Sequence, residues 1–154
     1  MEILNYLFRM WVIILKVLSI REPFASLIAS GDKKIETRSF KTNYRGELFI
    51  HASGKKIDKS IVDNTFINNM IKDKKMQFGK RICSVKLVDC VYMDQEFIDS
   101  IKDTKEYQLG LYKEGRYAWI LDNVELIEPI IAKGRLNIWN YQGDYKIINK
   151  KWCD

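Results

Sequence analysis

The sequence is poor in the residues that build metal sites, disulfide frameworks and low-complexity linkers. Its 154 residues include one histidine, three cysteines, two prolines and eight glycines. Cys83, Cys90 and Cys153 form no Cys-X-X-Cys pair, whereas a closed zinc site needs four cysteine or histidine ligands at short spacings. We therefore predict no metal and no other cofactor. The odd cysteine count favours a reducing compartment, the cytoplasm, with Cys83 and Cys90 as core thiols.

Long apolar runs are also missing. Residues 10–15 read MWVIIL and the apolar run continues to residue 20, but Arg9 and Lys16 interrupt it. The run is shorter than the roughly 20 apolar residues that cross a bilayer. The chain start carries Glu2 and lacks the small-residue cleavage pattern of a signal peptide. We expect residues 11–20 to form a buried strand, and we predict no membrane contact.

What is present is a globular composition with an uneven charge. The chain is 47% hydrophobic and 30% charged, which excludes intrinsic disorder and suits one domain with its own core. Residues 1–81 hold 16 basic and 8 acidic residues, whereas residues 82–129 hold 5 and 10. This asymmetry is typical of a surface whose positive side meets a polyanion. A merely solvated surface explains it equally well.

The apolar spacing predicts six or seven short strands and two or three helices. Helices are expected between Pro23 and Gly31, over residues 58–71, and from a cap at Asp94 to residue 101. Residues 102–115 are polar and look like an insertion. Strands are expected at 33–39, 47–52, 82–93, 116–121, 124–131 and 136–141, with a turn at residues 122–123. Helices and strands do not alternate, so the fold class is α+β, mostly β: a small antiparallel β-barrel with flanking helices.

Several motifs occur together in a family-like order. They are Leu18-Ser-Ile-Arg-Glu-Pro-Phe24, a G-X-K-X-X-E-X-R segment formed by Gly31, Lys33, Glu36 and Arg38, Tyr44-Arg-Gly46 with Ile50-His-Ala-Ser53, and Tyr117-Ala-Trp119. Over residues 16–141 the chain therefore resembles the ASCH domain, a relative of the RNA-binding PUA domain. The segment at 134–139 is similar to the closing strand of that family, although Asn137 departs from the small residue expected there.

The resemblance implies a PUA-like β-barrel with a cleft lined by the G-X-K-X-X-E-X-R segment. It places an ASCH domain at residues 16–154 and leaves residues 1–15 as an N-terminal extension that could add a strand. It implies RNA, a nucleotide or a modified nucleoside as the partner. Family members include coactivator parts, ribonucleases and acetylcytidine amidohydrolases, so whether this chain is an enzyme stays open. Its oligomeric state is also open.

The chemistry of the G-X-K-X-X-E-X-R segment supports a binding role. Glu36 and Arg38 are two residues apart on a strand, so they project from one face. Lys33 can neutralise a phosphate or polarise a carbonyl, and Arg38 can grip a phosphate or stack on a base. Glu36 can accept a hydrogen bond from a base or act as a general base. The alternative is an ion pair that holds the strand, although an exposed pair contributes only about 0–1 kcal/mol.

If the protein is an enzyme, Lys33 and Glu36 are the candidate catalytic residues. The amidohydrolase branch of the family has a threonine nucleophile three residues after the lysine, where this chain has Glu36. Thr37 comes one residue later and is expected on the opposite face of the strand. Hydrolysis by that route is therefore in doubt. A carboxylate-assisted hydrolysis, with Lys33 as electrophile and Glu36 positioning water, stays open, as does a protein-interaction module with scattered basic residues.

Further ligand-binding candidates flank this segment. Arg21 precedes the first helix, whose N–H groups could receive an anion, although Glu22 could cap that end instead. Tyr44 could stack on a base and Arg45 could contact a phosphate, or both could simply form a turn. Another set lies on the following strand and the basic loop: His51, Ser53 and residues 72–81. His51 is more often a hydrogen-bonded, partly buried residue than a catalytic one.

Overall fold

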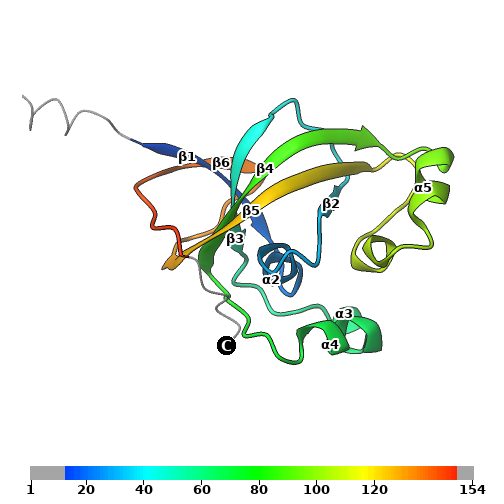
Figure 1. Ribbon diagram of the computed structural model, residues 1–154, viewed down its shortest axis with the longest axis horizontal. Helices are drawn as coiled ribbons and strands as arrows, with labels where there is room; N and C mark the ends of the chain where they lie inside the picture. Colours follow the sequence, from blue (N-terminus) through cyan, green and yellow to red (C-terminus); the bar gives the residue numbers. More distant parts are fainter. Residues whose placement is uncertain (1–12, 149–154) are drawn as a thin grey trace, which may run out of the picture.

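The computed structural model describes residues 13–148, which form a curved sheet flanked by short helices (Figure 1). The strands are β1 (Ile14–Ile20), β2 (Ile35–Arg38), β3 (Gly46–Ala52), β4 (Lys80–Tyr92), β5 (Tyr117–Ile131) and β6 (Ile138–Gln142). The helices are α2 (Phe24–Ala29), α3 (Lys59–Val62), α4 (Thr65–Ile71), α5 (Gln95–Ile101) and the 3₁₀ helix η1 (Lys105–Leu109). Residues 1–12 of the predicted N-terminal extension and Cys153 lie outside the described residues.

The sheet is mostly antiparallel, as predicted, but its barrel closure is not confirmed. The strand order is β2-β5-β4-β3-β1-β6, with β1 and β3 parallel. Within residues 13–148 no ladder joins the two ends of this order. β2 pairs with β5 on one side, and β6 pairs with β1 only as far as Leu18. Past Leu18, a side chain of β2 bridges the gap between β2 and β1. Nη2 of Arg38 donates to the carbonyl oxygen of Ser19 at 2.9 Å.

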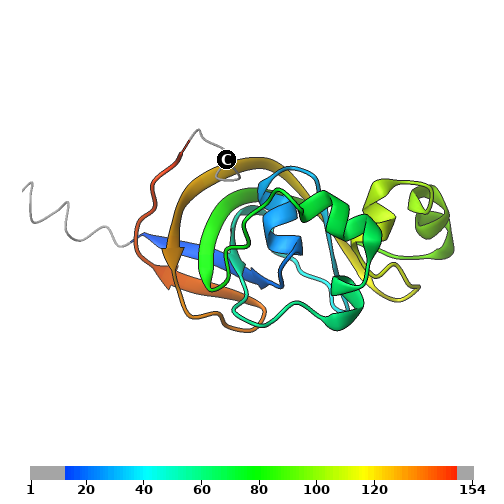
Figure 2. The ribbon, with the colours of Figure 1, turned by 90° about the horizontal axis from the view of Figure 1, so that it is seen from below.

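The two longest strands give the sheet its curvature. Their pairing shifts register three times, between Arg81 and Cys83, Ser84 and Lys86, and Leu87 and Asp89, and such bulges bend a strand. Figure 2 shows β4 and β5 curving around α2. The predicted turn at residues 122–123 is wrong. Asn123 does have a φ of 51°, but pairing with β4 continues on both sides of it, so β5 is one strand.

The core lies between α2 and the concave face of the sheet. Ala25 and Ile28 of α2 pack against strand side chains that include Cys83 and Trp119, all with no exposed surface. The prediction that Cys83 is a core thiol is therefore confirmed, whereas Cys90 is only half-buried against the same cluster. Burial of these apolar side chains fixes α2 and the strands that flank it.

The helices differ from the expectation in number. Residues 58–71 form two helices, because the Asn64 side chain accepts a hydrogen bond from the Ile67 N–H at 3.0 Å and starts α4 anew. Asp94 caps α5 as predicted, accepting from the Phe97 N–H at 2.8 Å. The polar stretch after α5 contains η1. Four α-helices and one 3₁₀ helix thus replace the two or three helices expected, within the part of the chain described here.

Candidate functional site

A pocket of about 750 Å³, called the first pocket, opens between β2, the end of β1 and the segment after η1. Its wall is partly apolar and carries Phe24, Phe40, Ile61, Ile67, Leu109 and Leu111. Its charged side chains are Arg21, Lys33, Glu36, Arg38 and Arg116. Glu36 is the one carboxylate among the described residues that line it. The pocket therefore combines apolar walls with hydrogen-bonding groups of both kinds, as ligand sites do.

Lys33 is an interior cation in the wall of this pocket. It is 1% exposed, and its Nζ donates to the carbonyl oxygens of Ile35 and of Leu109, the latter at 2.7 Å. Nζ also lies 3.9 Å from Oε2 of Glu36 and 5.3 Å from the centre of the Phe24 ring. Burial lowers the pKa of Lys33 below its usual 10.5, an effect that the Glu36 carboxylate opposes. Lys33 is therefore fixed in place and does not reach out to a phosphate.

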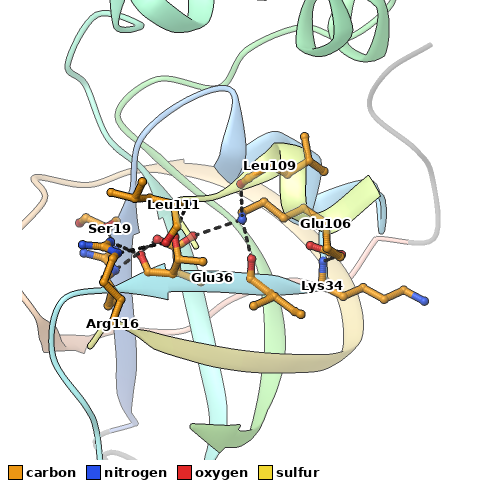
Figure 3. Close-up of polar contacts among 11 residues, drawn as sticks. Ser19, Lys34, Glu36, Glu106, Leu109, Leu111 and Arg116 are labelled. Atoms are coloured by element: carbon orange, nitrogen blue, oxygen red, sulfur yellow. Dashed lines mark hydrogen bonds and ion pairs between the residues drawn. The ribbon is translucent and has the colours of Figure 1, made fainter. Parts of the chain in front are cut away.

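Glu36 connects two cations. Its Oε1 lies 3.2 Å from Nε of Arg38, and its side chain is 12% exposed against 22% for Arg38. Oε2 faces Lys33. The predicted cluster is thus brought together in one row that opens to solvent at its Arg38 end. Figure 3 draws Glu36 within this network, together with Ser19 and Leu111, which border the same pocket.

The segment that follows α5 supplies groups that the sequence did not indicate. Leu109 contributes its carbonyl to Lys33, and Oε1 of Glu106 accepts a hydrogen bond from the backbone N–H of Lys34 at 2.6 Å (Figure 3). Nε of Arg116 donates to the carbonyl of Leu111 at 3.1 Å. Backbone carbonyls have no residue-type signature, so no motif could have identified Leu109. The only sequence feature that could have pointed to this segment is Arg116, a cation directly before a predicted strand.

Thr37, which is expected on the opposite face of β2 from Glu36, is also among the residues that border the first pocket. Its Oγ1 accepts a hydrogen bond from the Leu111 N–H at 3.1 Å. A Cβ atom at Gly110 would lie 2.8 Å from Cγ2 of Thr37, so the loop packs directly against this side chain. The Thr37 hydroxyl therefore fixes the pocket rim.

A second pocket, of about 560 Å³, adjoins the first. The two share four lining residues: Ser19, Arg21, Arg38 and Phe40. The remaining lining of the second pocket comes from two loops and β3: His51, Ser53, Gly54, Lys55, Gly134, Arg135, Leu136 and Asn137. Phe40 is held between the pockets because its carbonyl accepts from Nε1 of Trp119 at 3.2 Å and its ring meets the Trp119 ring edge-on at 5.8 Å.

His51 lies in a hydrogen-bond chain that runs from Trp139 through Ser19 to the Ala132 carbonyl. Nε1 of Trp139 can only donate, and it donates to Oγ of Ser19 at 3.2 Å. The Ala132 carbonyl can only accept, and it lies 2.7 Å from Nε2 of His51. The proton on Nε2 is therefore fixed, and in the neutral imidazole Nδ1 accepts from Oγ of Ser19 at 2.9 Å. Burial favours this neutral form and lowers the pKa of His51. His51 borders the second pocket as a fixed wall, which fits the structural interpretation better than acid–base work.

Tyr44 and Arg45 border neither pocket. The Tyr44 hydroxyl donates to the Glu47 carbonyl. Nη1 of Arg45 donates to the carbonyls of Thr42, at 3.0 Å, and of Tyr44, at 2.9 Å, and its Nη2 lies 3.5 Å from Oδ1 of Asp89. The structure therefore places both residues in the loop before β3, away from the other candidates. These contacts agree with the alternative interpretation, in which Tyr44 and Arg45 form a turn.

The start of α2 is filled by Glu22. This carboxylate is 1% exposed and accepts hydrogen bonds from the N–H groups of Ser26 and Gln77, both at 3.0 Å. An anion at this helix end, as the sequence suggested, would meet the Glu22 charge. Arg21 instead turns outward, borders both pockets and lies 3.8 Å from Oδ2 of Asp58.

The basic loop at 72–81 does not extend either pocket. Lys74 lies 3.4 Å from Oδ2 of Asp32. Arg81 is 1% exposed, and its guanidinium lies 4.0 Å from the centre of the Tyr141 ring. Neither side chain belongs to the wall of the two pockets. Lys74 and Arg81 therefore make contacts within the protein rather than at either pocket.

Two further features are absent from residues 13–148. No group of three or more His, Cys, Asp or Glu side chains there is arranged to hold a metal ion. The helices of this part of the chain are all too short or too polar to cross a membrane.

The chain was compared with known proteins. A family model described as the ASCH domain matches residues 18–131. Activating signal cointegrator 1 from Mus musculus and from Homo sapiens are each 28% identical to it over 130 residues. These matches cover 79% of this chain but 21% of each relative, so the chain spans about a fifth of their length.

Solved structures of the ASCH protein from Zymomonas mobilis are also similar. The unsubstituted protein and a single-residue variant are 22% identical to this chain with a TM-score of 0.48, cover 75% of it, and are themselves covered over 72% and 74%. The family model runs from within β1 to the end of β5 and so takes in both the G-X-K-X-X-E-X-R segment and the long strands. The chain therefore belongs to the ASCH domain family, a PUA-like fold often associated with RNA binding.

Proposed function

We propose that this protein binds RNA or a nucleotide, with a base or modified base in the first pocket. The observation that carries the proposal is the position of Glu36 between Lys33 and Arg38 in the wall of an open pocket. A purely structural ion pair needs no adjoining pocket. Membership of a family often associated with RNA binding and the basic first half of the chain support the same conclusion.

The lining of the first pocket suits a nucleobase. Bases present amino and imino N–H donors at their edges, and the Glu36 carboxylate is an acceptor. Base faces stack on aromatic rings and guanidinium groups, and Phe40 and Arg38 lie in the same wall. The apolar side chains around them exclude water and strengthen each hydrogen bond. The pocket can therefore recognise both the face and the edge of a base.

The protein-interaction alternative predicted basic residues scattered over the surface. Instead, Arg21, Arg38 and Arg116 border one pocket together with Lys33. Arg45 is the exception, since it borders neither pocket. Three cations of the early chain and Arg116 thus converge on one pocket, which favours a ligand of opposite charge or with acceptor groups.

Binding of a labelled single-stranded RNA of roughly ten nucleotides, followed by fluorescence anisotropy, tests the proposal. Arg38→Gln should weaken binding about tenfold because it removes a charge-assisted contact from the pocket. Arg45→Gln is the matched control, with the same loss of charge outside the pockets, and should stay within about twofold. Wild-type affinity should also fall as salt rises. Absence of wild-type binding, or equal effects of the two substitutions, would refute the proposal.

A second candidate is hydrolysis of an amide on a modified nucleoside, or of RNA. It is favoured by a buried amine whose pKa is lowered, next to a carboxylate at the pocket wall. In amide hydrolysis Glu36 would take the proton of a water whose oxygen adds to the amide carbon. The C–N bond would then break and the amine would leave with that proton, while Lys33, held by two backbone carbonyls, would keep Glu36 in position.

Chromatography of N4-acetylcytidine and of a short RNA, with and without a chelator, tests this candidate. Turnover by the wild type that is lost in Glu36→Gln supports it. No turnover by the wild type, or equal turnover by the variant, removes Glu36 catalysis from consideration.

A further inference from the structure

We infer that the second pocket is a phosphate site, so that the ligand is a nucleotide with its base in the first pocket and its adjoining phosphate in the second. This inference rests on the proposed function and assigns a chemical group to each pocket. The argument depends on the charges that line the pockets, on which donors are free, and on the wall that the pockets share.

The charges of the two linings differ in kind. The second pocket is bordered by Arg21, Arg38, Lys55 and Arg135, and no carboxylate from residues 13–148 lines it. The first pocket contains the Glu36 carboxylate. A phosphate offers only acceptor oxygens and negative charge, so Glu36 repels it, whereas a base edge can donate to Glu36. Electrostatics therefore sorts base and phosphate into different pockets.

Free donors are available in the second pocket. Lys55 and Arg135 are exposed, and neither lies within ion-pair distance of a carboxylate of the described chain. By contrast, the ammonium of Lys33 already donates hydrogen bonds to two backbone carbonyls. Arginine and lysine without internal partners bind phosphate oxygens through short, charge-assisted hydrogen bonds.

The loop that carries Lys55 adds a neutral donor. Oγ of Ser53 accepts a hydrogen bond from the backbone N–H of Lys55 at 3.3 Å, which leaves its hydroxyl proton for an acceptor in the pocket. His51 does not compete for this role, because both its ring nitrogens are engaged by Ser19 and Ala132. The phosphate contacts thus come from Ser53, Lys55 and Arg135.

The shared wall lets one ligand occupy both pockets. Ser19, Arg21, Arg38 and Phe40 line the first and the second pocket alike. A base and its own phosphate are separated by a single ribose, so a mononucleotide can lie across this wall. Phe40, 37% exposed, offers its ring at the crossing point. Either the 5′ or the 3′ phosphate would satisfy the lining, and the experiment separates them.

Isothermal titration calorimetry of the full chain provides the test. The probes are the four common ribonucleosides, their 5′- and 3′-monophosphates, and inorganic phosphate. We expect at least one monophosphate to bind about tenfold more tightly than its nucleoside at low salt. Lys55→Gln combined with Arg135→Gln should remove this gain and leave the affinity for the nucleoside unchanged. The control pair, Arg45→Gln with Lys86→Gln, removes the same charge at positions that border neither pocket and should keep the gain.

The outcomes distinguish the inference from the function on which it rests. If nucleosides bind as tightly as every monophosphate, or if the two double variants behave alike, the phosphate site is refuted while base binding stands. Loss of nucleoside affinity in the Lys55→Gln/Arg135→Gln variant also refutes the division between pockets. If the wild type binds neither these probes nor RNA, the proposed function itself fails.

Discussion

Nζ of Lys33 lies 2.7 Å from the carbonyl oxygen of Leu109, which is 76 positions further along the chain. This hydrogen bond ties the entry of β2 to the end of η1 and closes one side of the first pocket. It also explains why a cation can be buried there: two carbonyls and the nearby Glu36 replace most of its water. Lys33 is therefore part of the frame that holds Glu36 in the pocket wall.

Replacing Lys33 should cost stability. Lys33→Met keeps the volume of the side chain but leaves two carbonyls without their donor, so we expect a loss of about 2 kcal/mol or more in the free energy of unfolding. Lys34→Met is the control, because Lys34 is exposed and should change stability by at most about 0.5 kcal/mol. Urea unfolding followed by circular dichroism measures both. Equal stability of the two variants would contradict this role for the ammonium.

His51 should titrate at low pH and as a defined tautomer. Burial holds its pKa below the ordinary value of 6.5, so the folded protein resists a proton that the unfolded chain accepts. The stability contributed by neutral His51 is fully present above pH 6.5 and is lost as the pH falls toward the folded pKa. Because His51 is the only histidine, its imidazole nitrogens can be followed alone by ¹H–¹⁵N NMR. A midpoint at or above 6.5, or a proton on Nδ1, would contradict the hydrogen-bond chain.

Gly134 should not tolerate a methyl group. A Cβ atom there would lie 2.9 Å from Cε1 of His51 and 3.0 Å from Oγ of Ser19, both of which are held by hydrogen bonds. Gly134→Ala should therefore destabilise the fold by about 1–3 kcal/mol. Gly54 borders the same pocket, but a Cβ at Gly54 meets nothing within 4 Å. In thermal unfolding, Gly54→Ala should leave the stability nearly unchanged. A similar loss of stability in both variants would mean that the contacts at Gly134 with His51 and Ser19 do not cause it.

Stability should fall at alkaline pH. Burial raises the pKa of the Cys83 thiol well above its ordinary 9.0, so the folded protein keeps the proton while the unfolded chain releases it. This stability is fully present below pH 9.0 and is lost as the pH rises toward the folded pKa. Cys83→Ala should be less stable overall but should show a flatter decline between about pH 9 and 10.5. An unchanged slope in urea unfolding experiments would mean that Cys83 does not drive the loss.

Local patterns predicted most of the elements. The Pro23 to Gly31 signals identified α2, and Asp94 correctly marked the start of α5. Local patterns failed where a neighbouring strand decided the outcome. At Asn123 the backbone does turn locally, but β4 keeps pairing on both sides and makes the turn a bulge. The cytoplasmic location and the domain boundary at residue 16 stay predictions.

The amino-acid order by itself determined the family and the candidate residues Lys33, Glu36 and Arg38, because the G-X-K-X-X-E-X-R motif contains all three. Alternation along a strand also placed Glu36 and Arg38 on one face. The amino-acid order could not show that Tyr44 and Arg45 lie outside both pockets, nor that Leu109 completes the site. Those facts depend on where distant segments meet, and a backbone carbonyl is the same in every residue. Only the tertiary structure, through the curvature of β4 and β5 and the gap that Arg38 bridges, decided which of the candidates share a pocket.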